Sequence, residues 1–105
     1  MDVNITGRHL EITPPIQEYA QKRLAKLSRY YDRVHSAVVI ADKAEHHHYD
    51  LEVKVSADEG APFIAKVHGE DLYACLDQAA DKLERQLTDH KEMMRSRKGK
   101  TSMSG

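Results

Sequence analysis

Cysteine, glycine and long apolar runs are scarce in this sequence, and each shortage removes a class of protein. A single cysteine, Cys75, leaves no partner for an internal disulfide. No apolar stretch approaches the ~20 residues that cross a bilayer, and residues 1–4 lack the basic and then apolar pattern of a signal peptide. The five glycines form no phosphate-binding loop. We therefore expect a cytoplasmic protein that has no contact with a membrane.

The chain also has no excess of one charge sign, because its formal net charge is −1. The charges are nevertheless placed unevenly. Residues 20–33 and 82–105 each carry a net charge of +4, and residues 41–81 carry −7. Since salt screens charges beyond about 10 Å, one basic face can bind a polyanion even when the net charge is near zero. Two basic segments are also expected if each is simply the solvated face of a helix. The charge distribution alone therefore does not decide between a polyanion-binding face and two solvated helix faces.

Hydrophobic periodicity predicts a single domain over residues 1–95 and a mobile basic tail over residues 96–105. The expected elements are a strand at 2–7, a helix at 14–31, strands at 38–41, 49–56 and 63–68, and a helix at 70–95. Both helices carry an apolar stripe that must be buried on the sheet. This order predicts an α+β two-layer sandwich, in which two helices lie side by side on one face of a four-stranded sheet.

The cations of the first expected helix point away from its apolar stripe. Four of them lie roughly 140° to 200° round the helix from Leu24, the centre of that stripe: Lys22, Lys26, Arg29 and Arg33. Arg23 lies at the border, about 100° round. Like charges at i,i+4 repel by roughly 0.2–0.5 kcal/mol per pair. An anionic partner explains such a ridge better than a solvated face, although the solvated face stays open.

The second expected helix has a basic pair, Lys82 and Arg85, on one flank, and Lys91 lies on the other flank. If the Lys82 flank faces the first helix, the basic surfaces of both helices merge into one patch that suits the phosphates of structured RNA. The sequence lacks the paired aromatic residues of strands that stack on RNA bases. The candidate RNA-contacting residues are Lys22, Arg23, Lys26, Arg29, Lys82, Arg85 and Lys91.

Two groups of short motifs resemble one known family. The first group comprises residues 4–7 (Asn-Ile-Thr-Gly), 11–14 (Glu-Ile-Thr-Pro) and 25–27 (Ala-Lys-Leu). The second comprises residues 71–77 (Asp-Leu-Tyr-Ala-Cys-Leu-Asp) and 81–87 (Asp-Lys-Leu-Glu-Arg-Gln-Leu). Together they are similar to the bacterial ribosome hibernation promoting factors, also called the ribosome-associated translation inhibitor or sigma-54 modulation protein family. The resemblance covers about residues 1–95.

The resemblance implies a fold like that of double-stranded-RNA-binding domains, extended by a first strand. It also implies binding to the small ribosomal subunit near the decoding centre, where family members occlude the messenger and transfer RNA sites. The basic residues that contact ribosomal RNA in the family correspond to Arg23, Lys26, Lys82 and Arg85. Asp89 stands where the family usually has a basic residue. The basic end of the chain resembles the short hibernation factors, which permit ribosomes to pair, more than the related inhibitor with an acidic extension.

Other kinds of site have weaker support in the sequence. Consecutive histidines at 46–48 do not make a metal site without converging ligands, so we expect no metal and no cofactor. Cys75 fits a packing residue better than a nucleophile, and no acid–base pair or cleft indicates an enzyme or a small-molecule substrate. A generic double-stranded-RNA binder and a protein-interaction module remain as alternative functions. Paired ribosomes are a further expected partner that the sequence alone leaves open.

Overall fold

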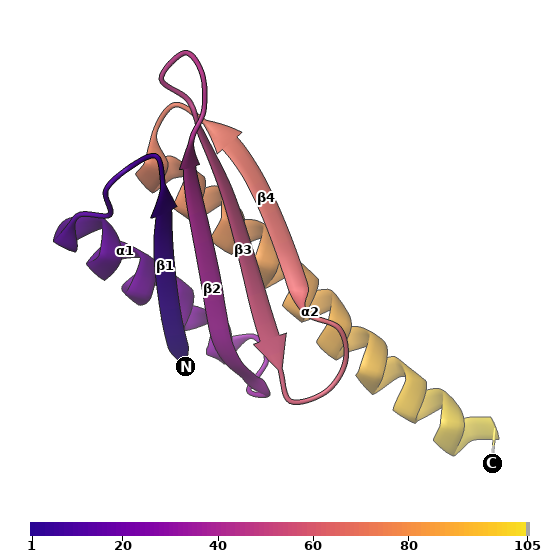
Figure 1. Cartoon of the computed structure of the whole chain (residues 1–105). Coiled ribbons are helices and arrows are strands. Elements are labelled where there is room, and N and C mark those ends of the chain that lie inside the picture. The colour runs from indigo at the N-terminus through magenta and orange to yellow at the C-terminus, as the bar shows by residue number, and fades with distance from the viewer. Residues whose placement is uncertain (105) are drawn as a thin grey trace.

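The computed structural model describes the backbone of residues 1–104 and the side chains of residues 1–95. Its elements, shown in Figure 1, are β1 (Asp2–Arg8), α1 (Pro14–Ala25), the short 3-10 helix η1 (Lys26–Arg29), β2 (Val34–Lys43), β3 (Tyr49–Ala57), β4 (Phe63–Gly69) and α2 (Leu72–Ser104). Both helices cover one face of the sheet, and α2 continues past its end. The α+β two-layer sandwich is therefore confirmed. The tail predicted at 96–105 lies outside the residues whose side chains are described.

The four strands form one mixed sheet in the order β1-β2-β3-β4. β1 pairs with β2 in parallel, because α1 carries the chain back across the sheet between them. β2, β3 and β4 form the predicted antiparallel meander. Side chains alternate between the two faces of each strand, so one face packs under the helices and the other is open to solvent.

The core lies between the helices and the covered face of the sheet. Fully buried leucines come from α1, η1 and α2, among them Leu24, Leu27, Leu76 and Leu83. They pack on the inward side chains of the strands within one hydrophobic cluster. Burial of each such side chain contributes roughly 1.5–3 kcal/mol relative to exposure, so this shared core fixes both helices on the same face. No helix within residues 1–104 is long and apolar enough to cross a membrane.

Two element boundaries differ from the sequence prediction. The first helix was expected to reach Tyr31, but α1 ends at Ala25 and η1 tightens the chain before the turn, where Ser28 Oγ donates to Ala25 O over 3.0 Å. β2 begins at Val34 rather than at Val38. A register shift between Val34 and Ser36 interrupts the alternation of buried residues. Because the period of two is broken there, the sequence pattern does not indicate that residues 34–37 belong to the strand.

An aspartate caps the start of α2, two residues after the predicted beginning of this helix at residue 70. Asp71 stands directly before the first helical residue, Leu72, and its Oδ1 accepts the backbone N–H of Tyr73 over 3.0 Å. A side-chain oxygen in this position satisfies one of the free N–H groups at the helix start. α1 begins after Thr13 with a proline in its first turn, but the Thr13 side chain makes no capping hydrogen bond.

Candidate nucleic-acid interface

Three cations form a ridge on the outer side of α1 and η1, which we call the α1 ridge: Lys22, Lys26 and Arg29. All three are exposed, and with Ala25 they line one surface hollow. Lys22 Nζ lies 3.1 Å from Glu18 Oε1 on the same helix. Within the described side chains, Lys26 and Arg29 have no ion pair. The α1 ridge therefore presents at least two cations whose charge is not neutralised nearby.

Arg23 occupies a different environment, between the two helices. Its guanidinium contacts three carboxylates of α2, at 3.3 Å from Asp77 Oδ1, 2.8 Å from Asp81 Oδ1 and 2.8 Å from Glu84 Oε1. The side chain is only 20% exposed. The hydrogen bond to Glu84 raises the pKa of Arg23 above its ordinary value, against an opposing effect of burial. This geometry gives Arg23 the role of joining α1 to α2 and leaves it little surface for RNA.

Tyr19 adds a second link at the same junction. Its hydroxyl donates to Asp77 Oδ1 over 2.5 Å, and its ring meets that of Tyr73 edge-on at a centroid distance of 5.1 Å. The hydrogen bond to Asp77 raises the pKa of Tyr19, since it favours the protonated phenol. Three acidic residues of α2 thus face α1, and one arginine and one tyrosine bind them.

The flank of α2 that carries Lys82 faces away from α1, so the condition for one merged basic patch is not met. Lys82 Nζ donates to the backbone oxygen of Lys66 over 3.1 Å, and Gln86 Nε2 donates to that of Ile64 over 2.9 Å. Both oxygens belong to β4, the strand at the sheet edge. Because Asp77, Asp81 and Glu84 occupy the flank toward α1, an acidic row separates the α1 ridge from Lys82. The expectation of a continuous patch is therefore wrong.

The two remaining candidates on α2 are exposed but lie on different sides of the helix. Arg85 follows Glu84 and shares the Lys82 flank, which also carries Asp89. Lys91 lies seven residues after Glu84, nearly on the same line of the helix, and so belongs to the flank toward α1 and η1. α2 and η1 are in contact. Of the predicted α2 cations, Lys91 is thus the one on the same side as the α1 ridge. The RNA contacts of all seven candidate residues stay predictions.

The acidic row is the part of this region that the sequence reasoning missed. Asp77, Asp81 and Glu84 recur at steps of four and three, which places them on one helical face. Arg23 was already located at the border of the buried stripe on α1. An acidic row on one helix and an arginine at the border of the buried stripe on the other could together have predicted ion pairs between the two helices.

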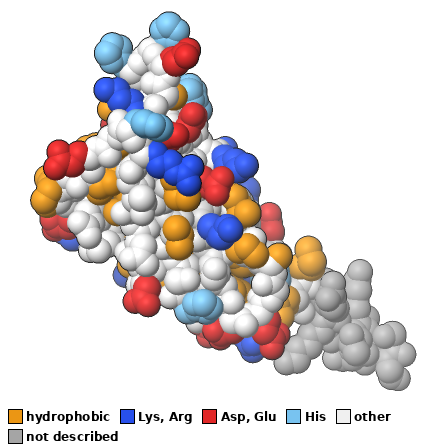
Figure 2. Space-filling model, viewed as in Figure 1, with side chains coloured by type: hydrophobic (Ala, Val, Ile, Leu, Met, Phe, Trp, Pro, Cys, Tyr) orange, Lys and Arg blue, Asp and Glu red, His pale blue; other side chains and the backbone are white. Residues whose placement is uncertain are grey.

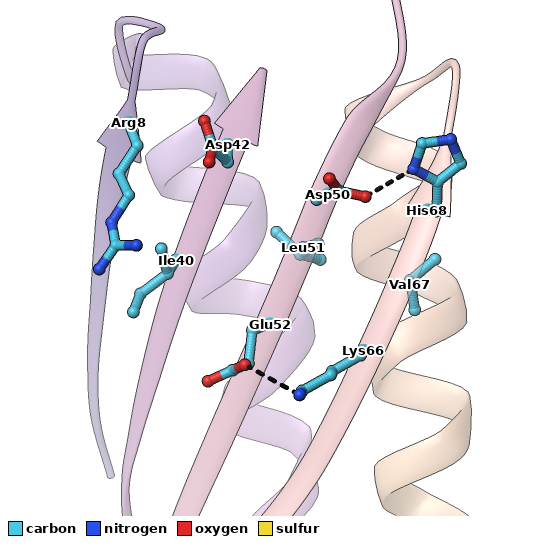
Figure 3. Close-up of a pocket in the computed structure, with 9 residues that line it drawn as sticks. All are labelled: Arg8, Ile40, Asp42, Asp50, Leu51, Glu52, Lys66, Val67 and His68. Carbon is cyan, nitrogen blue, oxygen red and sulfur yellow. Dashed lines mark hydrogen bonds and ion pairs between the residues drawn. The ribbon is translucent and has the colours of Figure 1, made fainter. Parts of the chain in front are cut away.

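The open face of the sheet has mixed charge, as Figure 2 shows. A hollow on this face is lined by side chains from all four strands, drawn in Figure 3. Lys66 Nζ lies 3.8 Å from Glu52 Oε2, and His68 Nδ1 lies 2.5 Å from Asp50 Oδ1. Cations and carboxylates are mixed on this face, where Asp42 and Asp50 are also cross-strand neighbours, so it lacks the uniform positive charge that favours an RNA backbone.

Cys75 and the histidines at 46–48 are residue types that can act as a nucleophile or as metal ligands. Cys75 is 1% exposed within the core, and burial raises the pKa of its thiol. It is therefore a packing residue, as predicted. His46–His48 belong to the loop between β2 and β3, residues 44–48. No group of acidic, histidine or cysteine side chains in residues 1–95 has the geometry to hold a metal ion.

A family model described as sigma 54 modulation protein / S30EA ribosomal protein matches residues 3–95, which is most of the chain. The chain belongs to this family. The ribosome hibernation promoting factor of Pseudomonas putida is 39% identical over 99 residues, covering 91% of this chain and 92% of that protein. The factor of the same name from Escherichia coli is 38% identical over 96 residues, covering 90% and 98%. The family is not one of enzymes, as the sequence predicted.

Solved structures agree with this assignment. The N-terminal domain of Thermus thermophilus Protein Y has a TM-score of 0.77 and 35% identity, and the match covers 86% of this chain and 99% of that chain. A ribosomal subunit interface protein from Coxiella burnetii has a TM-score of 0.78 at 24% identity, covering 88% and 99%, and supports the fold alone. The family predicted from the two groups of motifs is confirmed.

Proposed function

We propose that this protein binds the small ribosomal subunit through ribosomal RNA at the decoding region. There it blocks the messenger and transfer RNA sites and so inhibits translation in the cytoplasm during stationary phase or stress. Its family, and relatives named ribosome hibernation promoting factor, support an association with ribosomes. The observation that carries the RNA contact is the α1 ridge, where Lys26 and Arg29 are exposed and have no ion pair among the described side chains.

The proposed mechanism is steric and needs no chemical step. Cations on the α1 ridge neutralise phosphates and release their counterions, which supplies the affinity. The folded domain then occupies the space that the messenger and transfer RNAs need. Lys91 extends this contact from α2, while Lys82 and Arg85 reach a separate stretch of RNA beyond the acidic row. Arg23 acts as a positioning residue, because its three ion pairs hold α1 against α2.

A charge reversal on the α1 ridge tests this proposal. Lys26→Glu should abolish co-sedimentation with purified small subunits, because it replaces an attraction to phosphate by a repulsion. The matched control is Lys54→Glu, which makes the same change at an exposed position of β3 on the open sheet face. Circular dichroism checks that both variants fold. Equal binding by Lys26→Glu and the unaltered protein would overturn the proposed interface.

The two alternative functions give different results in the same assay. A generic double-stranded-RNA binder would be displaced from small subunits by an equal concentration of free RNA duplex. A protein-interaction module would keep its partner after the Lys26→Glu change. We expect neither result. Sedimentation of stationary-phase lysates on sucrose gradients, with detection of this protein, would show in addition whether it accompanies paired ribosomes.

A further inference from the structure

An exposed tyrosine stands directly after the α1 ridge. Tyr30 follows Arg29 at the end of η1, and its backbone N–H donates to the oxygen of Leu27 over 3.0 Å. The residue is 38% exposed. Any residue type except proline can supply this backbone hydrogen bond, so the local structure does not require an aromatic side chain at this position.

The hydrophobic core does not account for the Tyr30 ring either. Tyr31, the next residue, is 8% exposed and belongs to the core cluster, whereas Tyr30 is neither in this cluster nor among the partly buried residues packed against it. Within residues 1–95 the Tyr30 ring pairs with no other aromatic ring, in contrast to Tyr19 and Tyr73, which meet edge-on. The fold therefore gives this large ring no place in its interior.

The chain neighbours of Tyr30 place it between cations of the two helices. Arg29 precedes it and is one of the exposed cations of the α1 ridge. Tyr31 follows it and meets the ring of His90 on α2 edge-on, at a centroid distance of 5.2 Å. Lys91 comes directly after His90. Tyr30 thus lies where the end of the α1 ridge approaches the part of α2 that carries Lys91.

Positive charge beside an exposed aromatic ring is the combination by which many proteins bind single-stranded nucleic acid. Residues 26–33 carry three cations and one carboxylate, so the surroundings of Tyr30 in the chain are basic. Cations of this kind attract phosphates, whereas an aromatic ring stacks on the face of a base. The bases of a duplex are paired and already stacked, so only an unpaired nucleotide can be splayed out onto such a ring.

We infer that Tyr30 stacks on an unpaired base of the RNA whose phosphates the α1 ridge binds. This inference rests on the proposed function and adds to it the kind of nucleotide that the interface contacts. The α1 ridge supplies attraction to the backbone, which is the same for every sequence. Stacking by Tyr30 selects a place in the folded RNA where a nucleotide is free of base pairing.

Loss of the ring should weaken binding without changing its salt dependence. Binding of the fluorescently labelled full-length protein to purified small subunits is measured at several salt concentrations. Tyr30→Ala should lower the affinity on the order of tenfold at each of them, because stacking does not neutralise a phosphate and releases no counterion. Tyr30→Phe should bind within about twofold of the unaltered protein, since stacking needs the ring and not the hydroxyl.

The matched control is Tyr73→Ala, which removes a tyrosine of the same 38% exposure at the start of α2. This variant should bind as the unaltered protein does, and circular dichroism checks that every variant folds. The inference would be overturned by equal losses in the two alanine variants or by an equal loss in Tyr30→Phe. A less steep salt dependence for Tyr30→Ala would overturn it as well, because the lost contact would then be electrostatic.

Acylation of the 2′-hydroxyl groups of the subunit RNA detects the stacked nucleotide itself, because stacking restrains its motion. At saturating protein, one nucleotide should be protected by the unaltered protein and by Tyr30→Phe, and it should react again with Tyr30→Ala. Identical reactivity in all three complexes would overturn the inference while the α1 ridge stands. Unchanged binding by Lys26→Glu would instead overturn the proposed interface, and this inference with it.

Discussion

Gly7 illustrates how a single residue is fixed by its immediate surroundings. A Cβ atom at this position would lie 2.4 Å from the backbone oxygen of Leu10 and 3.1 Å from the side chain of Ile12. A contact that short with backbone cannot be relieved by a rotamer change. The glycine therefore allows the turn after β1 to fold back closely on the strand, which explains its place in the first group of motifs.

We predict that Gly7→Ala lowers the free energy of unfolding by about 2 kcal/mol or more, because the new methyl group displaces backbone. Urea denaturation followed by circular dichroism measures this change. Gly60→Ala is the control, since a Cβ there meets open space at a φ of 87°. It should cost only about 1 kcal/mol, from the left-handed backbone alone. A smaller loss for Gly7→Ala than for Gly60→Ala would contradict the steric account.

At the scale of elements, the relation between α1 and α2 depends on the ion pairs of Arg23. Glu84, its most shielded partner, is 21% exposed, whereas Asp81 is 66% exposed. Solvent screens the contact with Asp81 strongly, so the Arg23–Glu84 pair contributes more to stability. Removal of one partner of a shielded pair also leaves the other charge uncompensated.

Arg23→Met should therefore lower the free energy of unfolding by about 1–2 kcal/mol, although the methionine retains much of the packing. Lys22→Met removes an exposed pair on the same helix and should change stability by less than about 0.5 kcal/mol. A double-mutant cycle of Arg23→Met with Glu84→Gln, measured in urea, isolates the coupling between the two side chains. Additive effects would show that the pair contributes nothing of its own.

At the scale of the whole molecule, different surfaces carry different charge although the chain as a whole is nearly neutral. The α1 ridge is basic, the helix junction is acidic with Arg23 inserted, and the open sheet face is mixed. A surface of this kind favours one orientation toward a polyanion, because the α1 ridge places Lys26 and Arg29, which have no ion pair among the described side chains, close together on one helical surface. This orientation agrees with a protein that fills a site in folded RNA by its shape.

Binding to small subunits should accordingly weaken steeply with salt. If ~5 phosphates are contacted, the plot of log affinity against log salt concentration should have a slope of roughly −3 to −5. Lys26→Gln should make this slope less negative by about 1, because it removes one phosphate contact. Filter binding or sedimentation at several salt concentrations provides the measurement. A flat response would favour the protein-interaction alternative instead.

Much of this fold could be predicted from the sequence, since it depends on local patterns. Tyr49 to Ser56 alternate apolar and polar residues, and Leu76, Leu83 and Leu87 share one face of a helix. Such periodicity states directly which side of an element is buried. It failed at the start of β2, where the register shift breaks the period, and at Tyr31, where a 3-10 turn replaces the last turn of the helix.

The sequence by itself determined the elements, their buried faces and the outward direction of Lys22, Lys26 and Arg29. Only the tertiary structure decided which flank of α2 meets α1, and hence that Lys82 lies at β4 while Arg23 is held by carboxylates. It also decided that His68 of β4 stacks on His48 of the β2–β3 loop. The physical reason is that helical periodicity shows only where a side chain lies relative to the buried stripe of its own helix. Which residues of other elements it contacts depends on how those elements pack together.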